Sequence, residues 1–320
     1  MLDDPMMPRA MPRLEHGMII APSNMELVVN DHCNIACRQC NHASPVMKKW
    51  NTDPETTQAT LGRLATIYRC DRLRILGGEP LLHPNLTELI AIAKQSGIGK
   101  KVQLTTNGML LDRLSDEAWQ TLDEIELSVY KMANLTNDTI KSYQRKGEKF
   151  GTRVQPSHYD DFRMTFSTQG TQDQDLVNDI WKGCKMMNVW ACHSVRGTHI
   201  YRCPQSIYAM SLTGRSMTEE GFDILNAADL RDGLMGFLGG AGPLKSCHYC
   251  VGSCGKKFAQ NGLDRKSWKT DLDKPLEEMV DYELLERSKR EANPVDDCRQ
   301  PVKIRRGLVG KVQRRLNRLF

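Results

Sequence analysis

Three cysteines near the start of the chain are spaced closely enough to bind one metal centre. Cys33, Cys37 and Cys40 follow the pattern C-x3-C-x2-C. Three soft ligands so close together favour a loop wrapped around an iron–sulfur cluster. A four-iron cluster held by three cysteines keeps one iron open for chemistry. The alternative is a zinc site in which His32 or His42 supplies the fourth ligand.

Two apolar runs are expected to position this loop. Residues 25–30 are predicted to form a strand that leads into it, and residues 72–80 a second strand with a conspicuous ending. That ending consists of Gly77, Gly78, Glu79 and Pro80. The cysteine loop followed by this motif resembles the radical S-adenosylmethionine (SAM) superfamily. In that family the two motifs follow the first and second strands of a partial (β/α)6 barrel.

The resemblance implies roles for individual residues. The glycines would let the backbone approach the methionine part of SAM, and Glu79 would help to hold its ammonium group. The amine and carboxylate of SAM would chelate the open iron. In this family the residue before the third cysteine is usually aromatic and packs near the adenine, whereas here it is Gln39.

The next part of the chain alternates short apolar runs with segments of helical length. Strands are expected at 72–76, 101–106, 124–130 and 161–167, and helices from Asp53 as N-cap, at 84–96, at 112–122 and at 173–181. This alternation indicates an α/β fold with a parallel sheet and crossover helices. Asn107 and Ser128 fall at strand ends, where ligand sites gather. The resemblance implies that the ligand at these residues is SAM. An Asn-Gly turn that closes the strand explains Asn107 equally well.

A second group of cysteines begins after residue 183. Cys184 and Cys203 flank a predicted β-hairpin with Gly197 in its turn, and Cys247 and Cys250 form a C-x2-C pair. Two separated groups of this kind are typical of a second cluster or a zinc site. After a radical SAM barrel they resemble a twitch domain, the shortened form of the SPASM domain. The resemblance implies one auxiliary [4Fe–4S] cluster bound by these four cysteines.

Besides Cys70, which is expected to be a small buried apolar residue, three further cysteines have no place in either set. Cys192, Cys254 and Cys298 could supply the three ligands of a second auxiliary cluster with an open iron. Cys254 lies in a Gly-Ser-Cys-Gly turn, and flanking glycines would let it approach a substrate. We therefore consider it as the catalytic hydrogen-atom donor of an epimerase. The alternative is a buried or metal-binding thiol.

The domain boundaries follow from these patterns. We expect an irregular, proline-rich N-terminal arm at 1–24, a radical SAM partial barrel at 25–182 and an auxiliary-cluster domain at 183–260. A C-terminal helical region at 261–320 ends in a basic tail. Residues 299–320 contain eight Lys or Arg and no acidic residue, which favours a solvated helix or a weak contact with a membrane surface or an acidic partner.

Composition limits the surroundings and partners of the chain. Eleven cysteines without a secretory leader favour a reducing cytoplasm, and no apolar run is long enough to span a bilayer. A net charge of +5 over 320 residues is no argument for a nucleic-acid partner.

The resemblance implies an enzyme that cleaves SAM to a 5′-deoxyadenosyl radical and abstracts hydrogen from a C–H bond, with flavodoxin or ferredoxin as electron donor. Electron transfer to the auxiliary cluster would give dehydrogenation, and hydrogen return from a thiol would give epimerisation. The substrate is expected to be a sugar or aminocyclitol, because the short arm holds no leader-binding module. The alternatives are a maturase of ribosomal peptides or protein side chains, and a non-enzymatic metal-binding scaffold.

Overall fold

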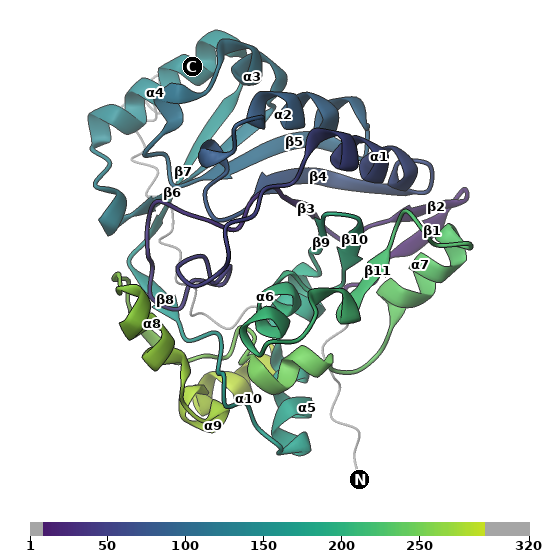
Figure 1. The fold of residues 1–320 in the computed structure, drawn as a ribbon, viewed down its shortest axis with the longest axis vertical. Helices are drawn as coiled ribbons and strands as arrows, with labels where there is room; N and C mark the ends of the chain where they lie inside the picture. Colours follow the sequence, from purple (N-terminus) through teal and green to yellow (C-terminus); the bar gives the residue numbers. More distant parts are fainter. Residues whose placement is uncertain (1–8, 292–320) are drawn as a thin grey trace, which may run out of the picture.

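The computed structural model describes residues 9–291, and its main feature is a curved ten-stranded sheet (Figure 1). The ten strands of this sheet are β1 (Arg13–Glu15), β2 (Met18–Ile20), β3 (Met25–Val28), β4 (Tyr68–Leu76), β5 (Gly99–Thr106), β6 (Glu124–Tyr130), β7 (Arg153–Tyr159), β9 (His193–Arg196), β10 (His199–Tyr201) and β11 (Gly221–Asp223). Two further strands, β8 (Asp161–Arg163) and β12 (Lys257–Ala259), lie outside it. Strands β3 to β7 run parallel in chain order. This arrangement confirms the predicted α/β fold class.

Helices α1 to α4 cover one face of the parallel strands, and α7 adds Leu234 and Leu238 to the same hydrophobic core (Figure 1). The helices are α1 (Pro54–Leu64), α2 (Leu86–Gln95), α3 (Asp116–Thr121), α4 (Asn137–Phe150), α5 (Gln174–Gly183), α6 (Pro204–Leu212), α7 (Leu230–Gly239), α8 (Arg265–Leu272), α9 (Leu276–Met279) and α10 (Tyr282–Arg290). Helices α1 to α4 form the covering layer. Helix α1 begins as predicted, because Asp53 accepts a hydrogen bond from the Thr56 amide at 2.8 Å.

The two faces of the sheet differ in chemistry because residues alternate along each strand. In β6, Ile125 and Leu127 are fully buried in the core beneath α1 to α4. Glu124, Glu126 and Ser128 point to the opposite face. Burial of the apolar face drives packing of the helices. The polar face is left to line the inner side of the curved sheet, and we call it the inner face.

The predicted hairpin after residue 183 is confirmed, and it extends the main sheet. Strands β9 and β10 pair antiparallel, and Gly197 has a φ of 58° in their turn. Strand β9 also pairs in parallel with β3. The sheet is therefore continuous across the boundary expected near residue 183.

The prediction of an irregular N-terminal arm is wrong for part of its length. Strands β1 and β2 form a hairpin, and β2 pairs in parallel with β4. His16 and Gly17 have φ values of 50° and 79°, the left-handed pair that a tight two-residue hairpin turn requires. The prolines lie outside both strands, so they do not prevent pairing.

Two other predictions need correction. Strand β7 and helix α4 were not expected, although β7 completes the row of parallel strands. The strand expected at 161–167 ends at Arg163, and β8 pairs with β12 in a separate two-stranded sheet.

No helix within residues 9–291 is long and apolar enough to cross a membrane. The basic tail and Cys298 lie outside the described residues.

Candidate active site

The loop between β3 and α1 carries the first set of cysteines. Cys33, Cys37 and Cys40 lie close enough for the charge of one thiolate to affect the others. Burial is the main cause that raises the pKa of Cys33 to about 12. Such thiols keep their protons unless a cation compensates the buried negative charge. The set therefore fits an iron–sulfur cluster, whose irons supply positive charge.

The strand end after β4 packs directly against this loop. A Cβ at Gly77 would overlap the backbone of Asn30, and one at Gly78 would overlap the backbone of His32. The Gly78 amide donates to Asn30 O and the Glu79 amide to His32 O, both at 2.9 Å. The glycines thus bring two backbones together, a role the resemblance did not suggest.

Glu79 places a carboxylate beside the cysteine loop with only 1% of its surface exposed. Thr106 Oγ1 donates to Oε1 at 2.6 Å, and the Asn107 amide donates to Oε2 at 2.9 Å. Burial raises the pKa of Glu79, because the charged carboxylate is less stable away from water. Among the described residues no cation pairs with it. The carboxylate is therefore suited to receive a cationic group of a ligand.

The other predicted SAM residues also lie near this loop. Asn107 Nδ2 donates to Asn34 Oδ1 at 2.7 Å and lies 3.8 Å from Cys33 Sγ. Pro80 is buried at the start of a short 3₁₀ turn. Ser128 is buried in β6 and interacts with Tyr130, whose phenol is close to Cys37. The structure brings these residues together with the first cysteine set.

Charged residues also cover the inner face of the sheet. Arg74 lies 3.0 Å from Glu126 and 3.7 Å from Glu26, and its Nε donates to Gln103 at 3.0 Å. Ser194 from β9 donates to Glu26 at 2.7 Å. Burial raises the pKa of Glu26, although Arg74 partly offsets this. The network joins five neighbouring strands, β3 to β6 and β9, and neutralises its arginine.

A second ion pair lies at the carboxyl ends of β3 and β9. Arg196 Nη2 is 2.6 Å from Asp31, and its guanidinium stacks on Trp50 at 3.8 Å from the ring centroid. The phenol of Tyr208, from α6, is electrostatically coupled to Asp31, Arg196 and the Cys40 thiol. Tyr208 is fully buried, and its hydroxyl has no hydrogen-bond partner among the described residues. A buried hydroxyl normally has a partner, so a ligand or water is expected here.

The second set of cysteines surrounds a small cavity of about 20 Å³. The four come from separate segments: Cys184 follows α5, Cys203 is the N-cap of α6, and Cys247 and Cys250 lie in and just after a 3₁₀ turn (Lys245–Tyr249). Burial raises the pKa of Cys203 well above its ordinary value, and the other three thiols add to the effect. A Cβ at Gly252 would come within 2.7 Å of Cys184 Sγ. Four thiols at one place match the complete ligand set of a four-iron cluster.

The zinc alternatives require several ligands around a single ion. Among residues 9–291, no group of three or more His, Cys, Asp or Glu side chains is arranged to hold one. His42, one suggested ligand, packs edge-on against Tyr208 with ring centroids 5.2 Å apart. Burial lowers the pKa of His42 to about 4.

The unassigned cysteines lie in different surroundings. Cys192 is buried near Glu26 and Arg74. Cys254 is fully buried in an apolar cluster with Leu176, Leu285 and others, and its thiol lies 3.6 Å from Gly183 O. A hydrogen-atom donor must reach the substrate, and this burial does not fit that role. Cys254 occupies the environment of the alternative, a buried structural thiol.

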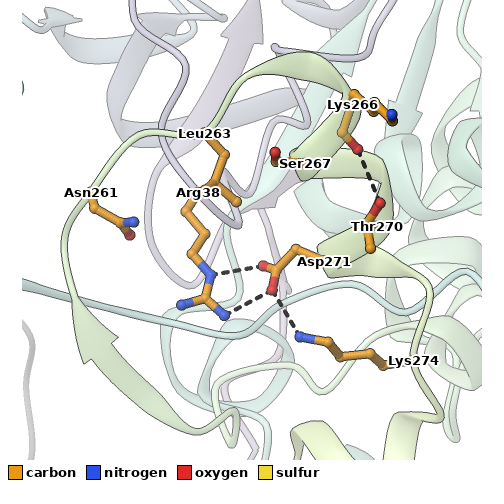
Figure 2. A pocket seen from close by; sticks show the side chains of 8 residues that line it. All are labelled: Arg38, Asn261, Leu263, Lys266, Ser267, Thr270, Asp271 and Lys274. Atoms are coloured by element: carbon orange, nitrogen blue, oxygen red, sulfur yellow. Dashed lines mark hydrogen bonds and ion pairs between the residues drawn. The ribbon is translucent and has the colours of Figure 1, made fainter.

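A cavity of about 460 Å³ lies against the outside of the cysteine loop (Figure 2). Its wall includes Arg38, and α8 supplies Lys266, Thr270 and Asp271. Asp271 binds both Arg38 and Lys274 in this view. No predicted SAM residue lines this cavity, so it is separate from the predicted SAM site.

Sequence reasoning missed Glu26, Arg74, Glu126, Arg196 and Tyr208. Charged residues alternate with apolar ones along parts of β3, β4 and β6, and this signal could have revealed the first three. No comparable signal marks Tyr208, because every residue from Pro204 to Met210 is buried.

Comparisons with known proteins concern the part of the site around the first cysteine set. Residues 27–153 match the family model of the radical SAM superfamily. The match spans less than half of the chain and contains the first cysteine set, Glu79 and Asn107. Members of the matched superfamily use a [4Fe–4S] cluster and SAM, so the match supports the interpretation of the first cysteine set as a cluster site.

Individual relatives cover less of the chain. A GTP 3′,8-cyclase of Chlorobaculum tepidum is 35% identical over 106 residues, or 33% of this chain and 32% of the relative. A GTP 3′,8-cyclase of Moorella thermoacetica is 34% identical over 120 residues, or 37% of this chain and 35% of the relative. The chain thus matches about a third of the length of these two relatives. A crystal structure of BtrN with AdoMet and 2-DOIA shares 17% identity at a TM-score of 0.42, covering 68% of this chain and 87% of that one.

Proposed function

We propose that this chain is a radical SAM enzyme with two [4Fe–4S] clusters that acts on a C–H bond of a small, hydroxylated substrate such as a sugar or aminocyclitol. The observation that carries the proposal is the convergence of seven buried or half-buried cysteines, from segments far apart in sequence, into two sets. Helix α6 contributes to both surroundings, because Cys203 begins it and Tyr208 lies near Cys40. A substrate between the sets would be close to both.

The residues of the first set have assignable roles. Cys33, Cys37 and Cys40 would hold the first cluster, and Glu79 would bind the SAM ammonium. The loaded cluster and SAM together supply the radical chemistry, for which a one-electron donor such as reduced flavodoxin or ferredoxin is needed. Cys184, Cys203, Cys247 and Cys250 would hold the auxiliary cluster. The auxiliary set supports a dehydrogenation, because such a cluster could accept the electron of the substrate radical. The burial of Cys254 favours its alternative role as a structural thiol.

The charges of the inner face favour an uncharged or cationic substrate. Arg74 is neutralised by Glu26 and Glu126, and Arg196 by Asp31. A triphosphate would require cations that are not already paired, and it would meet the carboxylates of this network. A hydroxyl group can both donate and accept hydrogen bonds, which suits Tyr208 and Asp31.

A second candidate is cyclisation of a purine nucleotide, because several relatives are named GTP 3′,8-cyclase, among them the two described above. Their matches of 106 and 120 residues are too short to contain both Cys33 and Cys184. The likeness therefore leaves out at least one cysteine set, and with it part of the proposed substrate surroundings.

An anaerobic assay distinguishes these functions. The reconstituted protein would be incubated with SAM, dithionite and, separately, inositols, aminocyclitols, hexoses, peptides and GTP, and 5′-deoxyadenosine would be followed. We expect a polyol or aminocyclitol to raise its formation above the level with SAM alone, with a product two electrons more oxidised. Stimulation by GTP alone would support the cyclase, and stimulation by peptides a maturase. An iron-loaded protein that never cleaves SAM would be a scaffold.

Tyr208 offers a test of the substrate position. Tyr208→Phe removes only the hydroxyl, so it should raise KM for the active substrate roughly tenfold, the effect of one lost hydrogen bond. The affinity for SAM should not change. Tyr282→Phe is the matched control, because that ring is exposed at 51%. An unchanged KM in Tyr208→Phe would place the substrate elsewhere.

A further inference from the structure

The side chain of Gln39 occupies a buried position between three segments of the chain. Only 3% of its surface is exposed, and its backbone has a left-handed φ of 52°. Oε1 accepts hydrogen bonds from the amides of Thr165 at 3.0 Å and Phe166 at 3.2 Å. Nε2 donates to Asp271 Oδ2 at 3.0 Å. The amide is therefore fully engaged, and it lies next in sequence to the cluster residue Cys40.

The backbone that Gln39 holds is also the backbone that supports the second cysteine set. Thr165 O accepts from the Val251 amide at 3.0 Å, and Ser167 N donates to Tyr249 O at 3.0 Å. Phe166 and Cys250 form an isolated antiparallel bridge. One extended segment, residues 164–168, thus contacts Gln39 on one side and the Cys250 turn on the other.

The same loop is fixed from outside by α8. Arg38 makes two bonds of 2.8 Å to the Asp271 carboxylate, which Lys274 also contacts at 2.9 Å (Figure 2). Trp268 Nε1 donates to Cys37 O at 2.8 Å. Both residues between Cys37 and Cys40 are therefore held by side-chain bonds to segments distant in sequence.

We propose that Gln39 is a positioning residue that couples the two cysteine sets, so that a cluster in one set stabilises the cluster in the other. This inference rests on the proposed function, because it requires both sets to hold clusters. The amide has one workable orientation: reversed, its NH2 group would face two N–H donors. A displacement of the Cys250 turn is therefore transmitted through 165–166 to the residue beside Cys40. Coupling of this kind is reciprocal.

A double-substitution experiment on the loaded, full-length protein tests the coupling. Cys247→Ser with Cys250→Ser removes the second cluster, and the rate at which a ferrous chelator extracts iron from the first cluster is measured. We expect the loss of the second cluster to speed this extraction at least roughly fivefold. In the Gln39→Leu background the extraction should already be fast, and removal of the second cluster should change it less than about twofold. The EPR signal of the reduced first cluster should shift in the same variants.

Two further variants keep the experiment decisive. Gln39→Glu retains an acceptor oxygen for Thr165 and Phe166, so it should preserve the dependence on the second cluster while it weakens the contact to Asp271. Gln120→Leu makes the same change as Gln39→Leu at an exposed position of α3 and should behave as wild type. Far-UV circular dichroism would be used to check that each variant is folded.

The outcomes separate the coupling from the proposed function. If wild type and Gln39→Leu respond equally to the loss of the second cluster, Gln39 does not couple the sets and the inference is wrong. If Gln39→Leu does not fold, the response of Gln39→Glu decides, because loss of the dependence there contradicts the inference. A wild-type protein that binds no iron at one of the sets overturns the proposed function, and the coupling with it.

Discussion

Glu79 shows how much of the site depends on single side chains. Its carboxylate receives hydrogen bonds from Thr106, Asn107 and the Leu81 amide, and it is buried beside Cys33. Neutral donors reduce the cost of burying this charge, but they do not cancel the charge itself. The ammonium group of a ligand would neutralise the charge of this carboxylate.

Glu79→Gln is therefore expected to weaken SAM binding and leave the first cluster intact. The lost charged hydrogen bond should cost about 1.5–3 kcal/mol, or roughly 10- to 150-fold in affinity. Equilibrium dialysis of SAM against the loaded protein measures the change, and iron analysis confirms the cluster. Glu117→Gln on the exposed side of α3 is the control. Equal SAM affinity in both variants would remove Glu79 from the site.

Among single residues, the sequence predicts those whose chemistry depends on neighbours close by in the chain. Cys33, Cys37 and Cys40 are recognisable because their spacing alone limits what they can bind. Gln39 and Tyr208 are not recognisable, because their importance comes from partners more than a hundred residues away, such as Thr165 for Gln39 and Asp31 for Tyr208. Only the folded chain brings those partners together.

Among the elements, α8 is fastened to the cysteine loop through Asp271. Its carboxylate lies between Arg38, Gln39 and Lys274. Burial by itself would raise the pKa of Asp271, but these hydrogen bonds outweigh burial and lower it to about 2. The charged form is thus favoured in the folded protein, and its contribution to stability depends on pH.

Asp271→Asn should lower the free energy of unfolding by about 1–3 kcal/mol at pH 7, because the carboxylate bonds to Arg38 and Lys274 are lost. A lowered pKa stabilises the fold above the ordinary value of 3.8, and this contribution is lost as pH falls towards about 2. The difference between wild type and variant should therefore shrink below pH 4.

Urea titrations of the metal-free protein at pH 7, 4 and 3 measure this trend. Asp273→Asn, at an exposed neighbouring position, should change stability little at any of these values. A difference between wild type and Asp271→Asn that stays constant with pH would contradict the assignment.

The elements were predicted best where apolar alternation is clean. The expected strand at 124–130 coincides with β6, and the expected helix at 173–181 with most of α5. Strand β7 was missed because Pro156 interrupts it and its flanks are polar. It tolerates the proline because it is an edge strand of the sheet, where one side needs no donor.

For the whole molecule, the two cysteine sets predict a definite metal content. Reconstituted protein should hold about eight irons per chain if each set binds a four-iron cluster. Replacing Cys33, Cys37 and Cys40 together by alanine should leave about half of that iron and abolish SAM cleavage. Iron and sulfide analysis on the anaerobic protein measures both clusters.

Cys70→Ala is the matched control for this triple substitution. Cys70 is buried in β4 and donates to Arg72 O at 3.1 Å, so it belongs to neither set. The variant should keep all its iron. An iron content unaffected by the triple substitution would show that the first set holds no cluster.

The pairing of β9 with β3 restricts how this chain can be recombined with others. A chimera that joined residues before 183 to a foreign C-terminal region would strip β3 of one neighbour. Met25 and Leu27 are buried there, and their strand would become an open, apolar edge of the kind that recruits other chains. Exchange of substrate specificity by grafting must therefore carry the β9–β10 hairpin along with the scaffold, and place its junctions beyond Tyr201.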